Sequence, residues 1–393
     1  MPATPHVRRA LPSSFATAWK AAGFMDDDNP VRRAPRDLRP PADEVGVDRR
    51  RFGRRGRVAS WVFGLAFLGF WVWFTNGHVN YVVISPGPTS NVDERLTVKG
   101  TAQYATTHNV LWATVNLKDS PPPLDVVVGW LKGDSDVFER RTILGDTSRA
   151  QSDRESRAEM DDAKLVAGIV AGRRAGAVPT GGGATVLEIA KGVPAAGVLH
   201  VGDVITAADG RAVCLQGDLR AALARVHPGA AVRLGVRRKG ASASTDVNVR
   251  TVARAGFSRA LIGITAGPVG GSPCRLPFTV SVDARRVGGP SAGLAMTLAI
   301  LDRLTPGDLL GAGPVAVTGT IEADGSVQEV GGVKQKTLAV KAAGAKLFIV
   351  PMSEVAIAQA HAGRMRVVGV TDLEGALVAL RQLGGTPLPS PSR

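Results

Sequence analysis

A serine and a lysine in two glycine-rich motifs are the residues of this sequence best suited to chemistry. Ser291 lies in the sequence GGPSAG, and Lys334, 43 residues later, lies in the sequence GGVK. A hydroxyl becomes a useful nucleophile only when a base removes its proton. A lysine can act as that base when burial in an apolar pocket keeps its amine neutral. The two motifs therefore predict a Ser291–Lys334 pair for nucleophilic catalysis.

Four motifs in this order resemble the proteolytic domain of Lon-type serine proteases, which use a Ser-Lys dyad. They are GPSAG at 289–293, TG at 318–319, GGVK at 331–334, and AAGA at 342–345 leading to IVP at 349–351. The resemblance covers about residues 261–383. Gly288 and Thr320 stand where Lon itself has acidic residues. Both departures look instead like the membrane-anchored, PDZ-containing relatives of Lon in Gram-positive bacteria, and the resemblance implies a homo-oligomer of the hexameric kind.

The resemblance also assigns supporting roles around the nucleophile. Thr318 is expected to orient the lysine through a hydrogen bond. Gly289 and Ala292 flank Ser291 at a predicted helix start, where unpartnered N–H groups favour a negatively charged oxygen. Lys336 competes with Lys334, but two residues along a helix are rotated by about 200°, so only one can face Ser291. The family pattern selects Lys334, and we expect Lys336 to face solvent.

The alternative for the same serine is an α/β-hydrolase, because GPSAG also fits the Gly-x-Ser-x-Gly pattern. That enzyme needs a histidine after the serine, and of the six histidines in the sequence only His361 follows Ser291. His361 falls within a predicted alanine-rich helix, which favours the dyad.

Residues 178–252 look like a PDZ domain, a module that adds the C-terminal end of an extended peptide to a sheet edge. The resemblance rests on GGG at 181–183, VLEI at 186–189, GDVI at 202–205 and DG at 209–210. By resemblance, the loop that holds the terminal carboxylate of a peptide is expected near the residues Gly182, Gly183, Ala184 and Val186. For the three glycines alone, a flexible linker is the other interpretation.

An uncharged stretch follows Arg57 and lasts until Asp93, and its apolar part predicts a transmembrane helix at 58–76. Six arginines between Arg49 and Arg57 place its N-terminal side in the cytoplasm. A buried core helix and a cleaved signal peptide are the alternatives, but 57 residues precede the stretch, more than a usual signal contains. We therefore expect an uncleaved anchor in the cell membrane, with the remainder of the chain extracytoplasmic.

The net charge of +14 invites a nucleic-acid interpretation, but thirteen basic and seven acidic residues within 1–57 account for much of it. The arginine runs are not interleaved with aromatic residues, so no nucleic-acid partner is expected.

No Gly-Lys-Ser or Gly-Lys-Thr phosphate loop occurs, and no Cys/His cluster has metal-ligand spacing. We expect no cofactor and no metal. The sequence leaves open whether Cys214 and Cys274 form a disulfide.

These patterns predict an α/β (α+β) Lon-type proteolytic domain plus a small β-rich PDZ domain, preceded by one transmembrane helix. The expected segments are a disordered basic tail at 1–57, the anchor at 58–76, an N-terminal extracytoplasmic segment at 80–175, the PDZ domain at 178–254, the proteolytic domain at 257–384 and a loose tail at 385–393.

The predicted function is that of an ATP-independent serine endopeptidase, with protein or peptide substrates that have exposed C-termini and with the lipid bilayer as a second partner. A catalytically silent, membrane-bound PDZ adaptor is the alternative from a different class. Retention of both Ser291 and Lys334 favours the enzyme.

Overall fold

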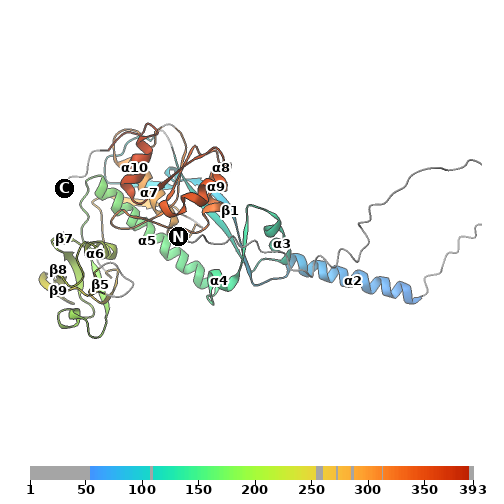
Figure 1. Ribbon diagram of the computed structural model, residues 1–393, viewed down its shortest axis with the longest axis horizontal. Coiled ribbons are helices and arrows are strands. Elements are labelled where there is room, and N and C mark those ends of the chain that lie inside the picture. The colour runs from blue at the N-terminus through green and yellow to red at the C-terminus, as the bar shows by residue number, and fades with distance from the viewer. Residues whose placement is uncertain are drawn as a thin grey trace, which may run out of the picture. The chain divides into compact units, whose positions relative to one another are not determined.

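The computed structural model describes residues 54–106, 109–253, 260–270, 273–284, 287–311 and 313–388 (Figure 1). The predicted tail up to residue 53, and residues 389–393, lie outside the described residues. The helices are α2 Arg54–Asn76, α3 Pro123–Leu131, α4 Arg140–Leu144, α5 Arg149–Arg174, α6 Gln216–Leu223, α7 Gly293–Leu304, α8 Val333–Ala342, α9 Val355–Ala362 and α10 Leu373–Arg381, with short 3₁₀ turns η1 Asp93–Arg95, η2 Pro194–Gly197, η3 Pro290–Ala292 and η4 Met352–Glu354. The strands are β1 Tyr81–Asn91, β2 Leu96–Lys99, β3 Val110–Asp119, β4 Asp136–Glu139, β5 Ala184–Ile189, β6 Val204–Ala208, β7 Arg211–Ala212, β8 Ala231–Arg237, β9 Ser244–Arg250, β10 Ile264–Gly267, β11 Thr279–Val282, β12 Val315–Val317, β13 Thr320–Ile321, β14 Val327–Gln328, β15 Leu347–Pro351 and β16 Arg366–Val370.

A six-stranded sheet in the order β16-β15-β12-β3-β1-β4 is the frame of the larger domain. β16, β15, β12 and β3 run parallel to one another. β1 pairs with β3 in the antiparallel direction, and β4 is antiparallel to β1. The sequence predicts 80–175 as a segment separate from the proteolytic domain, but its strands complete the sheet of that domain. The pairing that joins them, Val110 with Val315, connects residues too far apart in the chain for a local pattern to reveal.

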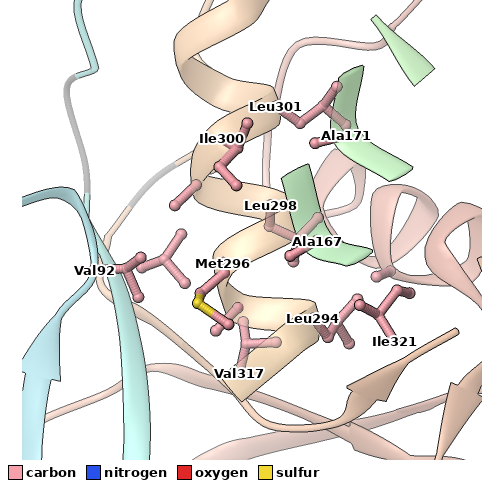
Figure 2. Close-up of a cluster of buried hydrophobic side chains, with 14 of the residues drawn as sticks. Val92, Ala167, Ala171, Leu294, Met296, Leu298, Ile300, Leu301, Val317 and Ile321 are labelled. Atoms are coloured by element: carbon pink, nitrogen blue, oxygen red, sulfur yellow. The ribbon is translucent and has the colours of Figure 1, made fainter. Parts of the chain in front are cut away.

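The helix that follows Ser291, α7, is the centre of the larger hydrophobic core. Its residues from Gly293 to Asp302 are all buried. Leu294, Leu298 and Leu301 belong to this cluster, together with Ala167 and Ala171 of α5 (Figure 2). Burial of one such side chain contributes roughly 1.5–3 kcal/mol. The position of the residue just before this helix is therefore set by the core.

The opposite face of the sheet is covered by α8 and α9. Val315 and Val317 of β12 belong to the core around α7, whereas Ala316 between them belongs to the core under α8. This alternation is expected of a strand that is covered on both faces. The domain is thus a layered mixed α/β structure, as the sequence predicts.

A second, smaller sheet has the order β10-β5-β6-β8-β9, with β7 beside β6. Figure 1 shows β5, β8 and β9 gathered with α6. The hydrophobic core of this domain includes Ile205, Val232, Leu234 and Val236, all of them fully buried. β10 lies beyond the predicted PDZ domain and is not expected from the sequence.

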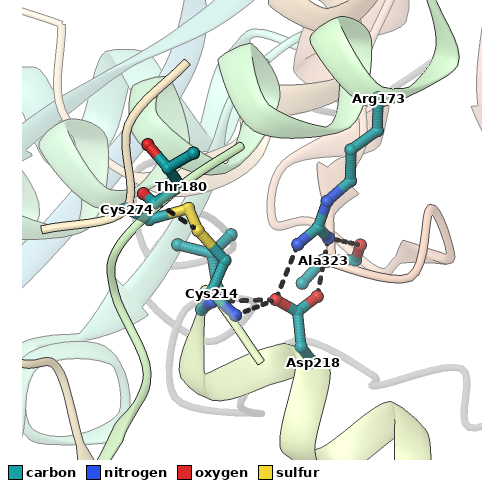
Figure 3. Close-up of a disulfide and its surroundings, with 7 residues drawn as sticks. Arg173, Thr180, Cys214, Asp218, Cys274 and Ala323 are labelled. Carbon is teal, nitrogen blue, oxygen red and sulfur yellow. Dashed lines mark hydrogen bonds and ion pairs between the residues drawn. A yellow bond between two sulfur atoms is a disulfide. The ribbon is translucent and has the colours of Figure 1, made fainter. Parts of the chain in front are cut away.

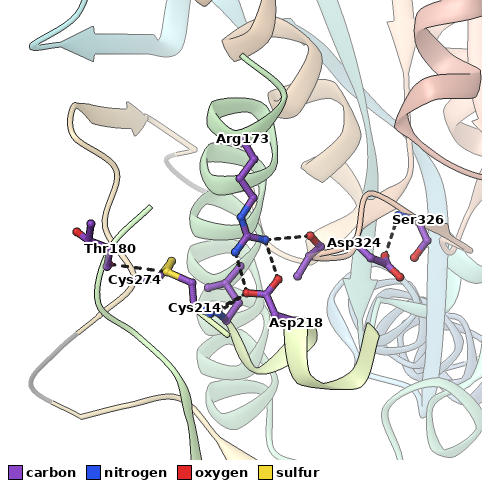
Figure 4. Close-up of polar contacts among 9 residues, drawn as sticks. Arg173, Thr180, Cys214, Asp218, Cys274, Asp324 and Ser326 are labelled. Carbon is purple, nitrogen blue, oxygen red and sulfur yellow. Dashed lines mark hydrogen bonds and ion pairs between the residues drawn. A yellow bond between two sulfur atoms is a disulfide. The ribbon is translucent and has the colours of Figure 1, made fainter. Parts of the chain in front are cut away.

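A disulfide between Cys214 and Cys274 joins the loop before α6 to the segment before β11 (Figure 3). Beside it, the Arg173 guanidinium on α5 donates to both carboxylate oxygens of Asp218, at 2.7 and 2.8 Å. Asp218 also accepts the backbone N–H groups of Cys214 and Leu215, and Arg173 also donates to the Ala323 carbonyl (Figure 4). A bidentate arginine–carboxylate pair is geometrically specific. The small sheet is therefore fastened to α5 by an ionic contact and to the segment before β11 by a covalent bond.

The N-terminal helix α2 carries an apolar stretch, Val58–Asn76, that is long enough to cross a bilayer, and none of it is buried in the structure. Trp61 and Phe63 are each about three quarters exposed. A core helix would bury such side chains. The exposure disfavours a core helix and leaves a membrane span or a signal sequence.

Candidate active site

Ser291 lies in the single turn η3, directly before α7. Gly289 precedes it with φ +82°, a conformation that glycine adopts most easily. The Gly289 N–H donates to the Ser156 carbonyl on α5 at 2.8 Å. The Ser291 carbonyl accepts the Gly319 N–H at 3.0 Å and the Thr318 hydroxyl at 3.2 Å. The backbone around the serine is thus held from both sides, with its side chain half-buried.

A cavity of about 720 Å³ opens at Ser291. Its walls come from β1, β3, β4, the turn that carries Ser291 and Ala292, and the start of α8. Most of the lining is apolar and includes Ile84, Ala113, Val115, Leu117, Phe138 and Ile143. A largely apolar cavity with a few polar groups is the usual form of a site that binds a small part of a substrate.

Lys336, and not Lys334, is the lysine that lines this cavity. Lys336 is 2% exposed, and burial lowers the pKa of its ammonium to about 8, although the nearby Glu354 carboxylate opposes the change. The Lys334 side chain is 23% exposed, and its ammonium forms an ion pair with Asp136 at 2.7 Å. The expectation of a solvent-facing Lys336 is therefore wrong, and the structure does not bring Lys334 into the Ser291 cavity.

The helical periodicity of α8 explains why Lys336 is buried and Lys334 is partly exposed, the reverse of what the sequence predicts. Val333, Lys336, Thr337 and Val340 recur at the spacing of one helix face, and all four are buried. Lys334 lies outside this stripe. Val333 and Val340 are apolar and lie on the same helix face as Lys336. Their spacing in the sequence could therefore have predicted that Lys336 is buried.

Asp136 at the start of β4 is a cavity residue that the sequence did not single out. Its carboxylate accepts from the Lys334 ammonium and from the Gln335 side-chain amide, both at 2.7 Å. Partial burial raises the pKa of Asp136, but these hydrogen bonds and the lysine charge outweigh it, so the pKa is lowered overall. An ionised Asp136 thus holds the start of α8 beside the cavity. Its partners lie 198 and 199 residues away, which no local pattern predicts.

Thr318 is fully buried, and its hydroxyl bonds the carbonyl of Ser291. The sequence predicts a bond to the lysine instead, and among the described residues the structure records none. His361, the histidine of the hydrolase alternative, is not among the residues that line the cavity. Its Nδ1 hydrogen-bonds the Ile357 carbonyl of its own helix.

The predicted carboxylate loop of the small domain lies directly before and within β5. The N–H group of Gly183 donates to the Cys214 carbonyl at 2.9 Å, and that of Val186 donates to the Asp203 carbonyl at 2.8 Å. The side chains of Ala184 and Val186 are fully buried. Gly182 packs closely against the Cys214 carbonyl. Two of the four predicted residues thus already use their N–H groups within the domain.

Comparisons with known proteins identify both domains. Residues 158–249 match the family model of the PDZ domain, and residues 281–373 match that of the Lon protease (S16) C-terminal proteolytic domain. The chain therefore carries a PDZ domain and a Lon-type proteolytic domain. β10 lies outside both matched regions.

Two Lon proteases illustrate the extent of the similarity. The Lon protease of Koribacter versatilis is 48% identical over 64 residues, which are 16% of this chain and 8% of that protein. The Lon protease of Trichlorobacter lovleyi is 35% identical over 108 residues, 26% of this chain and 13% of that protein. The chain thus spans a small part of the length of the curated relatives it matches. Among solved structures, the PDZ domain of the SdrC-like protein from Listeria monocytogenes is 28% identical, with 21% of this chain and 86% of that chain covered and a TM-score of 0.20.

Proposed function

We propose that this protein is a membrane-anchored, ATP-independent serine endopeptidase in which Ser291 is the nucleophile and Lys336 its general base. The Lon-type proteolytic domain supports a serine peptidase. The observation that carries the assignment of the base is the burial of Lys336 in the cavity that opens at Ser291. With a pKa of about 8, a useful fraction of this amine is neutral near physiological pH.

The proposed reaction uses these groups in two steps. The neutral Lys336 amine removes the Ser291 hydroxyl proton while the serine oxygen attacks the substrate carbonyl carbon. The resulting ammonium returns the proton to the leaving amine, and water then hydrolyses the acyl-serine. The N–H groups of the turn that carries Ser291 would stabilise the oxygen that becomes negative, because those of Gly293 and Leu294 already donate to the Pro290 and Gly319 carbonyls. The hydrogen bonds from Thr318 and Gly319 fix the serine backbone during both steps.

The surroundings support an extracytoplasmic location. The apolar and exposed α2 follows a cluster of arginines, which favours a cytoplasmic N-terminus. The Cys214–Cys274 disulfide is typical of an oxidising compartment outside the cytoplasm. Protein or peptide substrates there would have to be flexible or already exposed, because the sequence contains no phosphate loop for ATP.

The test is hydrolysis of a fluorescently labelled unfolded protein by the full chain in detergent micelles. We expect Ser291→Ala and Lys336→Met each to abolish hydrolysis, and the double variant to be no worse, because groups that act as one unit are not additive. Lys334→Met is the matched control, from the same helix, and should retain most activity. Full activity in Lys336→Met, or loss confined to Lys334→Met, would reject Lys336 as the base. Absence of activity in the wild type and in every variant would favour the silent adaptor.

A further inference from the structure

The short helix α3 packs one of its apolar faces on the six-stranded sheet. Val126 on this face is 4% exposed. Gly129 lies so close to the strands that a Cβ atom on it would meet Val137 of β4 at 3.0 Å and Val83 of β1 at 3.2 Å. This close contact fixes the rotation of the helix about its axis. It therefore also fixes the direction in which the other side chains of α3 point.

A second apolar face of α3 is exposed. Val127, Trp130 and Leu131 are spaced at i, i+3 and i+4, so they lie side by side along the helix. Their exposed fractions are 37%, 64% and 81%. Contiguous exposed apolar side chains mark an interaction surface, whereas single ones need no explanation. We call these three residues the α3 stripe.

Both ends of α3 lie near the point where the chain leaves α2. The Val79 N–H donates to the Pro121 carbonyl, two residues before α3, at 3.2 Å. At the other end of the helix, the ring of Trp130 meets the ring of Tyr81 edge-on, with the ring centres 6.2 Å apart. Val79 and Tyr81 are three and five residues beyond Asn76, the last residue of α2, and five extended residues span at most about 18 Å.

The dimensions of a lipid bilayer fit this arrangement. The apolar stretch of α2 has 19 residues, a length of about 28 Å in a helix, and the hydrocarbon layer of a bilayer is about 30 Å thick. The end of α2 next to α3 would then lie where the hydrocarbon meets the lipid headgroups. Tryptophan is enriched at this level, and a helix on a membrane surface buries its apolar face about 5–10 Å into this layer.

We propose that the α3 stripe contacts the lipid bilayer that α2 spans, and that it holds the catalytic domain against the membrane surface. α3 packs on β4, and Asp136 of β4 lines the cavity that opens at Ser291. The contact therefore sets the orientation of this cavity relative to the membrane. The inference rests on the proposed membrane anchor and is independent of which lysine is the base.

The experiment labels single positions of the full chain with a fluorophore. The two cysteines of the sequence form a disulfide, so one introduced cysteine can be labelled selectively. The variant Leu131→Cys is labelled with nitrobenzoxadiazole and reconstituted into phosphatidylcholine vesicles with or without bromine atoms on the acyl chains. We expect bromine to reduce its emission roughly twofold, because the stripe would lie about 5–10 Å deep.

The matched control is Ile357→Cys with the same label. Ile357 is an apolar residue that is 50% exposed on α9, and α9 lies beside β16, at the opposite edge of the sheet from β4. Five strand spacings, about 24 Å, separate these edges, so bromine should change its emission little. Val127→Cys, one turn earlier on the α3 stripe, repeats the measurement if Leu131→Cys does not fold.

A label at Phe67→Cys in α2 tests the anchor separately. Quenching at Phe67 without quenching at Leu131 and Val127 would overturn the proposal and leave the anchor in place. Quenching at none of the three positions would reject both the anchor and the α3 contact. A blue-shifted emission at Leu131 without quenching would also overturn the proposal, because it would show that protein, such as a second copy of the chain, covers the stripe.

Discussion

Replacing Lys336 with methionine should remove activity and, at neutral pH, make the protein more stable. Folding places this lysine in a cavity where its pKa is about 8, whereas the ordinary value is 10.5. Between these values the unfolded chain binds more protons than the folded protein, so stability rises as the pH rises through this interval. Below pH 8 the full penalty applies. At 1.36 kcal/mol per pKa unit, the difference corresponds to roughly 3 kcal/mol.

Methionine has a similar shape and carries no charge, so it should recover most of this penalty. Glu354 loses its cationic neighbour in the variant, which reduces the gain to about 2–3 kcal/mol. For a domain of this size, a gain of that order raises the melting temperature by several degrees. The assay is thermal unfolding of wild type and Lys336→Met at pH 7 and at pH 10, followed by circular dichroism.

The expected advantage of Lys336→Met is large at pH 7 and small at pH 10, where the wild-type lysine is neutral in the folded protein. Lys334→Met is the control. It breaks the ion pair with Asp136 and should leave the melting temperature unchanged or lower it. A variant that melts below the wild type at pH 7, or an advantage that does not change with pH, would refute the argument from a desolvated ammonium.

Three further outcomes follow from the site and the disulfide. Hydrolysis by the wild type should rise as the pH increases through about 8, the pKa of Lys336, and a profile that is flat from pH 6 to 9 would contradict this base. Thr318→Val keeps the shape of the side chain but loses the hydrogen bond to the Ser291 carbonyl, worth about 1 kcal/mol, so kcat should fall roughly fivefold with KM little changed. Cys274→Ser opens a loop of 60 residues and should lower the free energy of unfolding by about 2–4 kcal/mol, and an unchanged melting temperature would show that the small domain does not need the covalent bond.

The parts of this structure that depend on local pattern were predictable from the sequence. The position of Ser291 at the start of a helix follows from the glycines and the proline that precede it. The environments of Lys334 and Lys336 were also a local question. The expectation that Lys336 faces solvent was wrong because the family spacing was given more weight than the buried stripe of α8.

Long-range pairing accounts for what the sequence could not provide. The contact of Asp136 with Lys334 and Gln335 joins β4 to α8 across nearly 200 residues. The joining of the N-terminal strands to the sheet of the proteolytic domain and the pairing of β10 with β5 are of the same kind. In each case the sequence of one segment would allow it to pair with many other segments. The pairing that forms depends on how the side chains pack in the folded core.

The route from β10 to Ser291 indicates how the two domains influence each other. After β10 the chain is fastened at Cys274, then pairs with β2 through β11, before it reaches the nucleophile. A change in the packing of β10 therefore reaches a segment whose far end is held, and the geometry at Ser291 should stay the same. We expect Ile262→Ala to hydrolyse a short peptide substrate, too short to occupy both sites, with wild-type kcat and KM. KM for a long unfolded protein should increase, because Ile262 anchors the strand that forms one wall of the groove beside α6. If kcat for the short peptide changed severalfold in Ile262→Ala but not in Thr265→Ala, the PDZ domain would act on the active site itself rather than by holding substrate near it.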